Sequence, residues 1–232
     1  MVTDFALVGA ALASRARSAM LNAMLEAEPV PAGELARIAR VSPSTATEHL
    51  SALLRGGMVR SIRTGRHHRF TLANADVANA LEALARISPQ LPPRSLGQSL
   101  QADAFRFARM CYDHVAGSLG VAILDRFVML NWLSLRGEEF LVRRTGEKGF
   151  ENLGIRLAAL RQGRRAFAKA CLDVTERRPH LAGALGAALA RRMVEQGWIE
   201  RIPGSRAIRL RPQGRVVLSR KLGLDMLKSS PR

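Results

Sequence analysis

The stretch "ELARIARVSPSTATEHLSALLRGGMVRSIRTGRHHRFTL", from Glu34 to Leu72, decides the fold of the first third of this chain. Ser42 is a natural N-cap, Pro43 suits the first helical position, and Gly56-Gly57 ends the helix that they begin. The helix is expected to direct Ala46, Leu50, Leu53 and Leu54 toward a core. A shorter helix, "AGELARIAR", precedes it. This pattern predicts a helix-turn-helix.

Polar side chains occupy the N-terminal half of the second of these helices. Short polar groups at the start of a helix can reach base edges in the major groove without holding the helix away from the DNA. The residues predicted to contact DNA from this helix are Ser44, Thr45, Thr47, Glu48 and His49.

The segment after the two glycines, "MVRSIRTGRHHRFTL", predicts a β-hairpin with its turn at Thr64-Gly65. Its tip is basic. A basic hairpin beside a recognition helix forms a wing, which contacts phosphates or the minor groove. The wing residues predicted to contact DNA are Arg63, Thr64, Arg66, His67 and His68.

The charge of the chain agrees with a polyanionic partner. The 232 residues carry a formal net charge of +17, and no acidic residue lies between Glu48 and Asp76. No apolar run approaches the roughly 20 residues that span a bilayer, and the N-terminal stretch makes a poor signal peptide. Two cysteines exclude a disulfide framework. We therefore expect a cytoplasmic protein that binds double-stranded DNA and no membrane.

The residues from Glu34 to Leu72 resemble the ArsR family of winged-helix bacterial repressors. The polar recognition helix, the glycine pair and the wing occur together and in order, and with the flanking helices the resemblance covers about residues 4–87. It implies a winged helix-turn-helix domain over 1–87, mainly α with small β-hairpins. It also implies a homodimer on a palindromic operator.

Both metal sites of that family are absent from this sequence. The helix before the recognition helix, "ELARIAR", has no cysteine, and the helix after the wing, "NADVANALEALARI", has Asp76 but no histidine. We therefore expect no metal site and no cofactor, and any signal is expected to enter elsewhere in the chain.

The segment "SPQLPPRSLGQS", residues 88–99, is rich in proline and serine and is typical of a linker. We expect a linker over 88–100 and a second domain over 101–228, which a small ArsR repressor lacks. This domain is interpreted as an effector or dimerisation domain.

The second domain nearly repeats itself. The phrases "HVAGSLG" at 114–120 and "HLAGALG" at 180–186 follow "FARMCYD" from Phe107 and "FAKACLD" from Phe167. We interpret this as an internal duplication, with repeats at about 105–155 and 165–224. Each repeat is expected to be a degenerate winged helix of two helices, a hairpin and a short helix.

Each repeat supplies a cysteine, an aspartate and a histidine. Cys111 and His114, three apart on an expected helix, would share a face. Three interpretations stay open: structural packing, a pocket for a small organic effector, and a thiophilic-metal or redox site. The two aspartates could instead cap helices or pair with Arg177 or Arg178. An apolar lining favours an organic ligand over a metal. The candidate effector-binding residues are Cys111, Asp113, His114, Trp132, Cys171, Asp173, His180 and Trp198.

These patterns predict a sequence-specific, homodimeric transcriptional repressor that is released by an effector in its C-terminal domain. One alternative is an architectural DNA-binding protein that uses charge without reading sequence. Another is an enzyme with a Cys–His nucleophile joined to a DNA-binding domain, but no known signature surrounds either cysteine. We therefore expect no catalytic residues.

Overall fold

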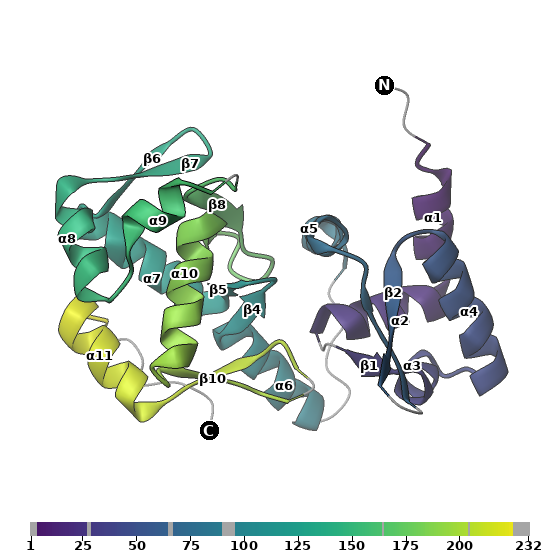
Figure 1. The fold of residues 1–232 in the computed structure, drawn as a ribbon. Helices are drawn as coiled ribbons and strands as arrows, with labels where there is room; N and C mark the ends of the chain where they lie inside the picture. Colours follow the sequence, from purple (N-terminus) through teal and green to yellow (C-terminus); the bar gives the residue numbers. More distant parts are fainter. Residues whose placement is uncertain are drawn as a thin grey trace. The chain divides into compact units, whose positions relative to one another are not determined.

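The computed structural model describes residues 4–26, 29–64, 67–89, 96–163, 165–203 and 205–224 (Figure 1). The chain divides into two compact units. The first unit is residues 1–87 together with 203–206, and the second is residues 88–202 together with 207–232. Each unit has its own hydrophobic core.

The first unit is a winged helix-turn-helix (Figure 1). Its elements are α1 (Ala6–Ala13), α2 (Arg15–Glu26), β1 (Val30–Pro31), α3 (Ala32–Ala39), α4 (Pro43–Arg55), β2 (Val59–Thr64), β3 (His67–Leu72) and α5 (Ala75–Ile87). Met20, Met24, Leu35 and Leu53 are almost completely buried in its core. These side chains bring α2, α3 and α4 together.

Helix α4 begins as the sequence predicts. The Ser42 hydroxyl accepts a hydrogen bond from the Thr45 amide at 3.1 Å, and Pro43 occupies the first turn. Ala46, Leu50 and Leu53 are buried, but Leu54 is 39% exposed, so its expected core position was wrong. Leu54 follows Leu53 by about 100° around the helix, which turns it away from the stripe that faces α2 and α3.

The wing of the first unit is part of a small antiparallel sheet. Strand β3 pairs with β2 from Val59↔Leu72 to Thr64↔His67, and its other edge pairs with β1. The sequence did not predict β1, because two residues carry no periodic signal. Asn74 caps α5, accepting a hydrogen bond from the Val77 amide at 3.0 Å.

The second unit joins helices with short antiparallel hairpins (Figure 1). Its elements are α6 (Leu96–Phe107), β4 (Arg109–Cys111), β5 (His114–Ala116), α7 (Gly117–Met129), β6 (Leu133–Arg136), β7 (Glu139–Val142), α8 (Arg144–Asn152), α9 (Leu157–Arg161), β8 (Lys169–Leu172), β9 (Pro179–Ala182), α10 (Gly183–Glu195), β10 (Ile199–Arg201), β11 (Ile208–Leu210) and α11 (Pro212–Leu222).

Two stretches of this unit run through the same series of hairpin, helix, hairpin and helix. The first is β4–β5, α7, β6–β7 and α8, and the second is β8–β9, α10, β10–β11 and α11. Strands β4 and β5 form one sheet, β6 to β9 form a second in chain order, and β10 and β11 form a third. The parallel series agrees with an internal duplication, which stays a prediction.

Two expectations for this unit were wrong. The segments that end in Cys111 and Cys171 form strands rather than helices, and the histidine of each repeated phrase lies on the strand that precedes the helix. Helix α6 begins at Leu96, inside the expected linker of 88–100. Residues 90–95 of that linker lie outside the described residues.

Within the described part of the chain, none of the helices has the length and apolar character needed to span a membrane.

Candidate DNA interface and effector site

The start of α4 presents polar side chains to solvent. Ser44, Thr47 and Glu48 are exposed, whereas Thr45 is half-buried. The Ser42 hydroxyl lies 2.8 Å from Ser44 Oγ and 2.9 Å from Thr45 Oγ1, so the cap of the helix engages both neighbouring hydroxyls. Of the exposed polar residues at the start of α4, Thr47 and Glu48 therefore make no hydrogen bond with the Ser42 hydroxyl.

Two further contacts fix side chains on this helix. The Thr47 hydroxyl donates to the Pro43 carbonyl at 2.9 Å. Half-buried His49 lies with its Nδ1 3.4 Å from Nη1 of Arg17 on α2, and Arg17 also donates to the carbonyls of Ala10 and Ala11. His49 is thus tied to the corner between α1 and α2. No sequence pattern indicated this link.

The wing carries exposed arginines on both strands. Arg60 and Arg63 on β2 and Arg69 on β3 are exposed, and Arg63 Nε donates to His68 Nε2 at 2.8 Å. The side chains of Thr64 and His67 and the whole of Arg66 lie outside the described residues. Arg60 and Arg69 are also exposed on the wing, although the predicted contact set omitted them.

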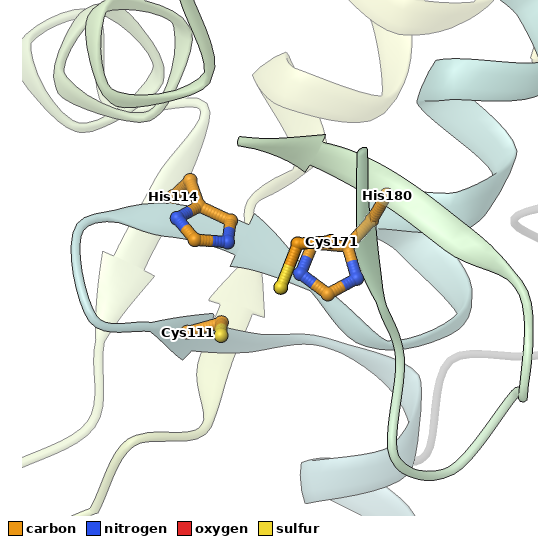
Figure 2. Close-up of side chains that lie close together, drawn as sticks. All are labelled: Cys111, His114, Cys171 and His180. Carbon is orange, nitrogen blue, oxygen red and sulfur yellow. The ribbon is translucent and has the colours of Figure 1, made fainter. Parts of the chain in front are cut away.

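The two cysteines and two histidines of the second unit lie together. Cys111 pairs with His114 across the β4–β5 hairpin, and Cys171 pairs with His180 across the β8–β9 hairpin. Figure 2 shows the four side chains directed toward one another from the two hairpins. One ligand atom from each lies within 4.8 Å of the others. Cross-strand pairing, and not the expected helical spacing, brings each cysteine beside its histidine.

Asp113 supports the first histidine. Its Oδ1 lies 3.3 Å from Nδ1 of His114, and Arg165 binds the same carboxylate through both terminal nitrogens. Burial opposes ionisation of Asp113, but Arg165 and His114 hold its pKa well below the usual range. Burial likewise opposes a charge on His114, yet its contacts with Asp113 and Cys111 raise its pKa to about 9.

Asp173 occupies the corresponding place beside the second histidine. Its Oδ2 lies 3.4 Å from Nδ1 of His180, and both residues are completely buried. The carboxylate lies 3.0 Å from Nη2 of Arg109 and accepts hydrogen bonds from the amides of Gly117, Thr175 and Glu176 and from the Thr175 hydroxyl. Burial opposes ionisation, but Arg109 and these amides hold the pKa of Asp173 well below its usual range.

The arginine partners of both aspartates differ from the expected ones, although Asp173 does accept from the first amide of α7, as the capping alternative expected. Asp113 pairs with Arg165 and Asp173 with Arg109, whereas Arg178 pairs with Asp125 on α7 at 2.8 Å. Arg109 and Arg165 are the supporting residues that the sequence reasoning missed. Arg109 precedes Cys111 by two positions on a three-residue strand, and Arg165 is 52 residues from Asp113, so neither has a local signal.

The two tryptophans of the predicted effector set pack elsewhere in the unit. Trp132, after the end of α7, stacks on Phe127 with ring centroids 5.4 Å apart and packs edge-to-face against Phe150 of α8. It also lines a cavity of about 310 Å³ with Gly149, Asn152, Leu153 and Lys221. Trp198, after the end of α10, is buried with its backbone against Gly214 of α11. We do not retain either tryptophan in the candidate effector site.

The capped polar helix and the basic hairpin define a winged helix-turn-helix DNA-binding domain. Residues 12–62 match the model of a family described as a helix-turn-helix domain. Over 226 residues, 97% of this chain and 100% of the relative, the chain is 39% identical to a protein of Bacillus subtilis (strain 168) described as the uncharacterized HTH-type transcriptional regulator YdfF. This chain belongs to the HTH-type transcriptional regulators, and its predicted winged helix-turn-helix is confirmed.

Solved structures similar to this chain match about a third of it. HlyU from Vibrio cholerae N16961 is 28% identical and covers 36% of this chain and 90% of its own, with a TM-score of 0.33. The cadmium metal-sensor CMTR from Mycobacterium tuberculosis is 32% identical and covers 39% of this chain and 98% of its own, with a TM-score of 0.31.

Proposed function

We propose that this transcriptional regulator is a homodimeric repressor that reads a palindromic operator and is released by an effector bound in its second unit. The observation that supports it best is the pairing of an exposed polar helix start with a basic wing in one domain. Thr47 and Glu48 lie at the start of α4, and Arg60, Arg63 and Arg69 lie on the adjoining hairpin. The helix offers base-reading groups and the hairpin offers phosphate-binding groups.

Separate groups for base reading on α4 and for phosphate binding on the wing favour a repressor over an architectural protein. A protein that binds DNA through charge alone needs the arginines but has no use for exposed hydroxyl and carboxylate groups on the recognition helix. Glu48 in particular would be repelled by phosphates, whereas a glutamate in the major groove can accept a hydrogen bond from cytosine N4. The recognition helix therefore supports sequence-specific binding.

An exposed apolar helix supports the homodimer. Helix α1 and the residue before it expose Phe5, Leu7 and Val8, and Ala11 is the one buried residue in the helix. Exposed apolar patches of this kind are typical of protein interfaces. A second copy of this chain fits best, because a palindromic operator presents two identical half-sites to two identical domains.

The second unit supports an effector function because it contains a cluster of reactive side chains that DNA binding does not need. Cys111, His114, Cys171 and His180 lie in a unit separate from the recognition helix and the wing. An enzyme based on a Cys–His pair is not supported, because no known catalytic signature surrounds either cysteine in the sequence. We therefore assign no catalytic residues.

Selection of DNA from a random pool with the full-length chain tests DNA reading. We expect enrichment of an inverted repeat whose half-sites are centred about 10–10.5 base pairs apart, or a multiple of that spacing, as for paired recognition helices. Enrichment of no motif, with uniform affinity across the pool, would support the architectural alternative and overturn the repressor.

The dimer is tested by measuring the mass of the protein in solution. Leu7→Glu places a charge on the exposed face of α1 and should convert the dimer to a monomer. Met129→Glu on α7 is a matched control, because Met129 is 71% exposed and belongs to the other unit. A wild-type protein that is monomeric at micromolar concentration, or a dimer insensitive to Leu7→Glu, contradicts this assignment of the interface.

A further inference from the structure

The four cysteine and histidine side chains of the second unit have nearly the spacing of a tetrahedral metal site. Zinc binds sulfur at about 2.3 Å and imidazole nitrogen at about 2.0–2.1 Å, so the ligand atoms of a tetrahedral site lie roughly 3.3–3.8 Å apart. In this structure the corresponding atoms all lie within 4.8 Å of one another. Rotations of side chains that already face one another would bring them to a common ion (Figure 2).

Burial gives a second and independent observation. His180 is completely buried and His114 is 5% exposed. Among the described residues, Nε2 of His114 and both ring nitrogens of His180 lack a hydrogen-bond partner. A buried polar atom without a partner is costly, and a metal ion would satisfy one nitrogen of each ring.

The aspartates beside the histidines determine which nitrogen would bind the ion. Asp113 lies against Nδ1 of His114, and Asp173 lies 3.4 Å from Nδ1 of His180. Histidine ligands of metals usually have a carboxylate or carbonyl at their other nitrogen, which fixes the ring and makes it a better donor. His114 therefore has the outer support of a metal ligand. Asp173 gives His180 a nearby carboxylate, within ion-pair distance but without a hydrogen bond, and each ring can offer its Nε2.

Arginines hold these aspartates in place, and one aspartate connects the two stretches of repeated elements. Arg165 holds Asp113, and Arg109 holds Asp173. Asp173 also accepts from the Gly117 amide at the start of α7, 56 residues away. The two carboxylates are therefore held in place without an ion: Asp173 by a buried arginine and backbone amides, and Asp113 by a partly exposed arginine.

We propose that one zinc ion binds to Cys111, His114, Cys171 and His180, and that it is the effector of this regulator. Two thiolates and two imidazoles in a tetrahedral arrangement are typical of zinc, and two thiolate charges neutralise the ion. The site itself is independent of the function proposed above. Its role as an effector rests on that function.

Zinc would act by joining the β4–β5 hairpin to the β8–β9 hairpin. It would therefore restrain the first stretch of the unit against the second. A ligand shifts a regulator only when it binds one conformational state more tightly than another, so the chain bound to DNA must hold the hairpins at a different spacing from the free chain. Reciprocally, operator DNA must weaken zinc binding by the same factor.

Cobalt titration of the full-length protein tests the site. The reduced, chelator-treated chain should bind one Co²⁺ with the visible bands of a tetrahedral ion and a thiolate-to-metal charge-transfer band, and Zn²⁺ should displace it. Cys171→Ser and, separately, His114→Gln should remove this spectrum and weaken zinc binding by more than about 100-fold, since loss of a direct ligand exceeds the 10–100-fold cost of losing an outer partner.

Two controls keep the metal test decisive. His68→Gln removes an exposed histidine of the wing and should leave the cobalt spectrum unchanged. The unfolding midpoint, followed by the fluorescence of the two tryptophans in the second unit, shows whether each variant folds without metal. No bound ion in the folded wild-type chain, an octahedral cobalt spectrum, or a site that persists in Cys171→Ser overturns the metal site. A disulfide between the cysteines that persists in the reductant-treated protein also overturns it.

The effector role is tested with the selected operator DNA. Zinc should weaken operator binding by the wild-type chain by about 5–150-fold, the usual range of allosteric coupling, and should not change binding by Cys171→Ser. An unchanged operator affinity in zinc-loaded wild-type protein overturns the effector role and leaves a structural metal. If the chain binds no operator DNA but still gives the tetrahedral cobalt spectrum, the proposed repressor function is overturned and the metal site is retained.

Discussion

Gly186 of α10 lies against His114 of β5: a Cβ atom added to this glycine would stand 3.3 Å from the histidine Cβ. The relationship is reciprocal, because a Cβ atom on Gly120 of α7 would stand 3.5 Å from the Cβ of His180. The second glycine of each repeated phrase thus makes room for the histidine of the other phrase. This mutual close approach places the two histidine rings with their centroids 5.1 Å apart.

Gly186→Ala should destabilise the second unit. The added Cβ would lie 2.3 Å from the Leu181 carbonyl oxygen, and backbone cannot yield as the end of a flexible side chain can. Overpacking of this kind typically costs about 1–3 kcal/mol. Urea unfolding followed by tryptophan fluorescence measures it, since both tryptophans belong to this unit.

Gly163→Ala is the matched control for that substitution. Its nearest neighbours would be Leu160 O at 3.7 Å and Arg165 N at 4.0 Å, which are ordinary contacts. We expect its free energy of unfolding to stay within about 1 kcal/mol of the wild-type value. Equal stability of the two variants would show that α10 does not need its close approach to β9.

The sequence predicted the first unit much better than the effector cluster. A serine cap, a proline and two glycines delimit α4, and the apolar stripe continues over several turns. The strands that hold Cys111 and His114 have three residues each, which is too short for periodicity to separate strand from helix. In the turn between them Tyr112 has a φ of 58°, in the left-handed region. A glycine or asparagine at this position would have indicated a turn in the sequence, but a tyrosine does not. Cys111 lies near Cys171 and His180 only because the tertiary fold brings the two hairpins together, and no local sequence pattern predicts that contact.

Asp173→Asn should cost far more stability than Asp125→Asn. Asp173 and Arg109 are both completely buried, and removal of one partner from a buried ion pair typically costs about 3–5 kcal/mol because the remaining charge stays uncompensated. Asp125 and Arg178 form a partly exposed pair, which is worth about 0–1 kcal/mol. Unfolding free energies of the two variants, measured in urea at neutral pH, give the comparison. A loss below about 1 kcal/mol in Asp173→Asn would contradict the structural role of the buried pair.

Substitutions on α4 and on the wing should affect DNA binding differently. Thr47→Ala removes an exposed hydroxyl from the helix start and should reduce the preference for operator over random DNA. Arg63→Ala removes an exposed charge and should weaken binding to all sequences, reducing the slope of log affinity against log salt by about 0.9. Titration of operator and random DNA at several salt concentrations separates the two effects. An unchanged slope in Arg63→Ala together with Arg69→Ala would contradict the assignment of the wing to phosphate contact.

Asp113→Asn should weaken zinc binding by about 10–100-fold without removing the tetrahedral cobalt spectrum. The change leaves all four proposed ligands in place, but it removes the charge that orients His114 and that Arg165 holds. Competition with a chelator of known affinity measures the loss, and Asp125→Asn, a carboxylate of α7 paired with Arg178, should leave the zinc affinity unchanged. An affinity in Asp113→Asn equal to that of the wild-type chain would show that the carboxylate does not support the ligand, whereas complete loss of the spectrum would show that Asp113 itself binds the ion.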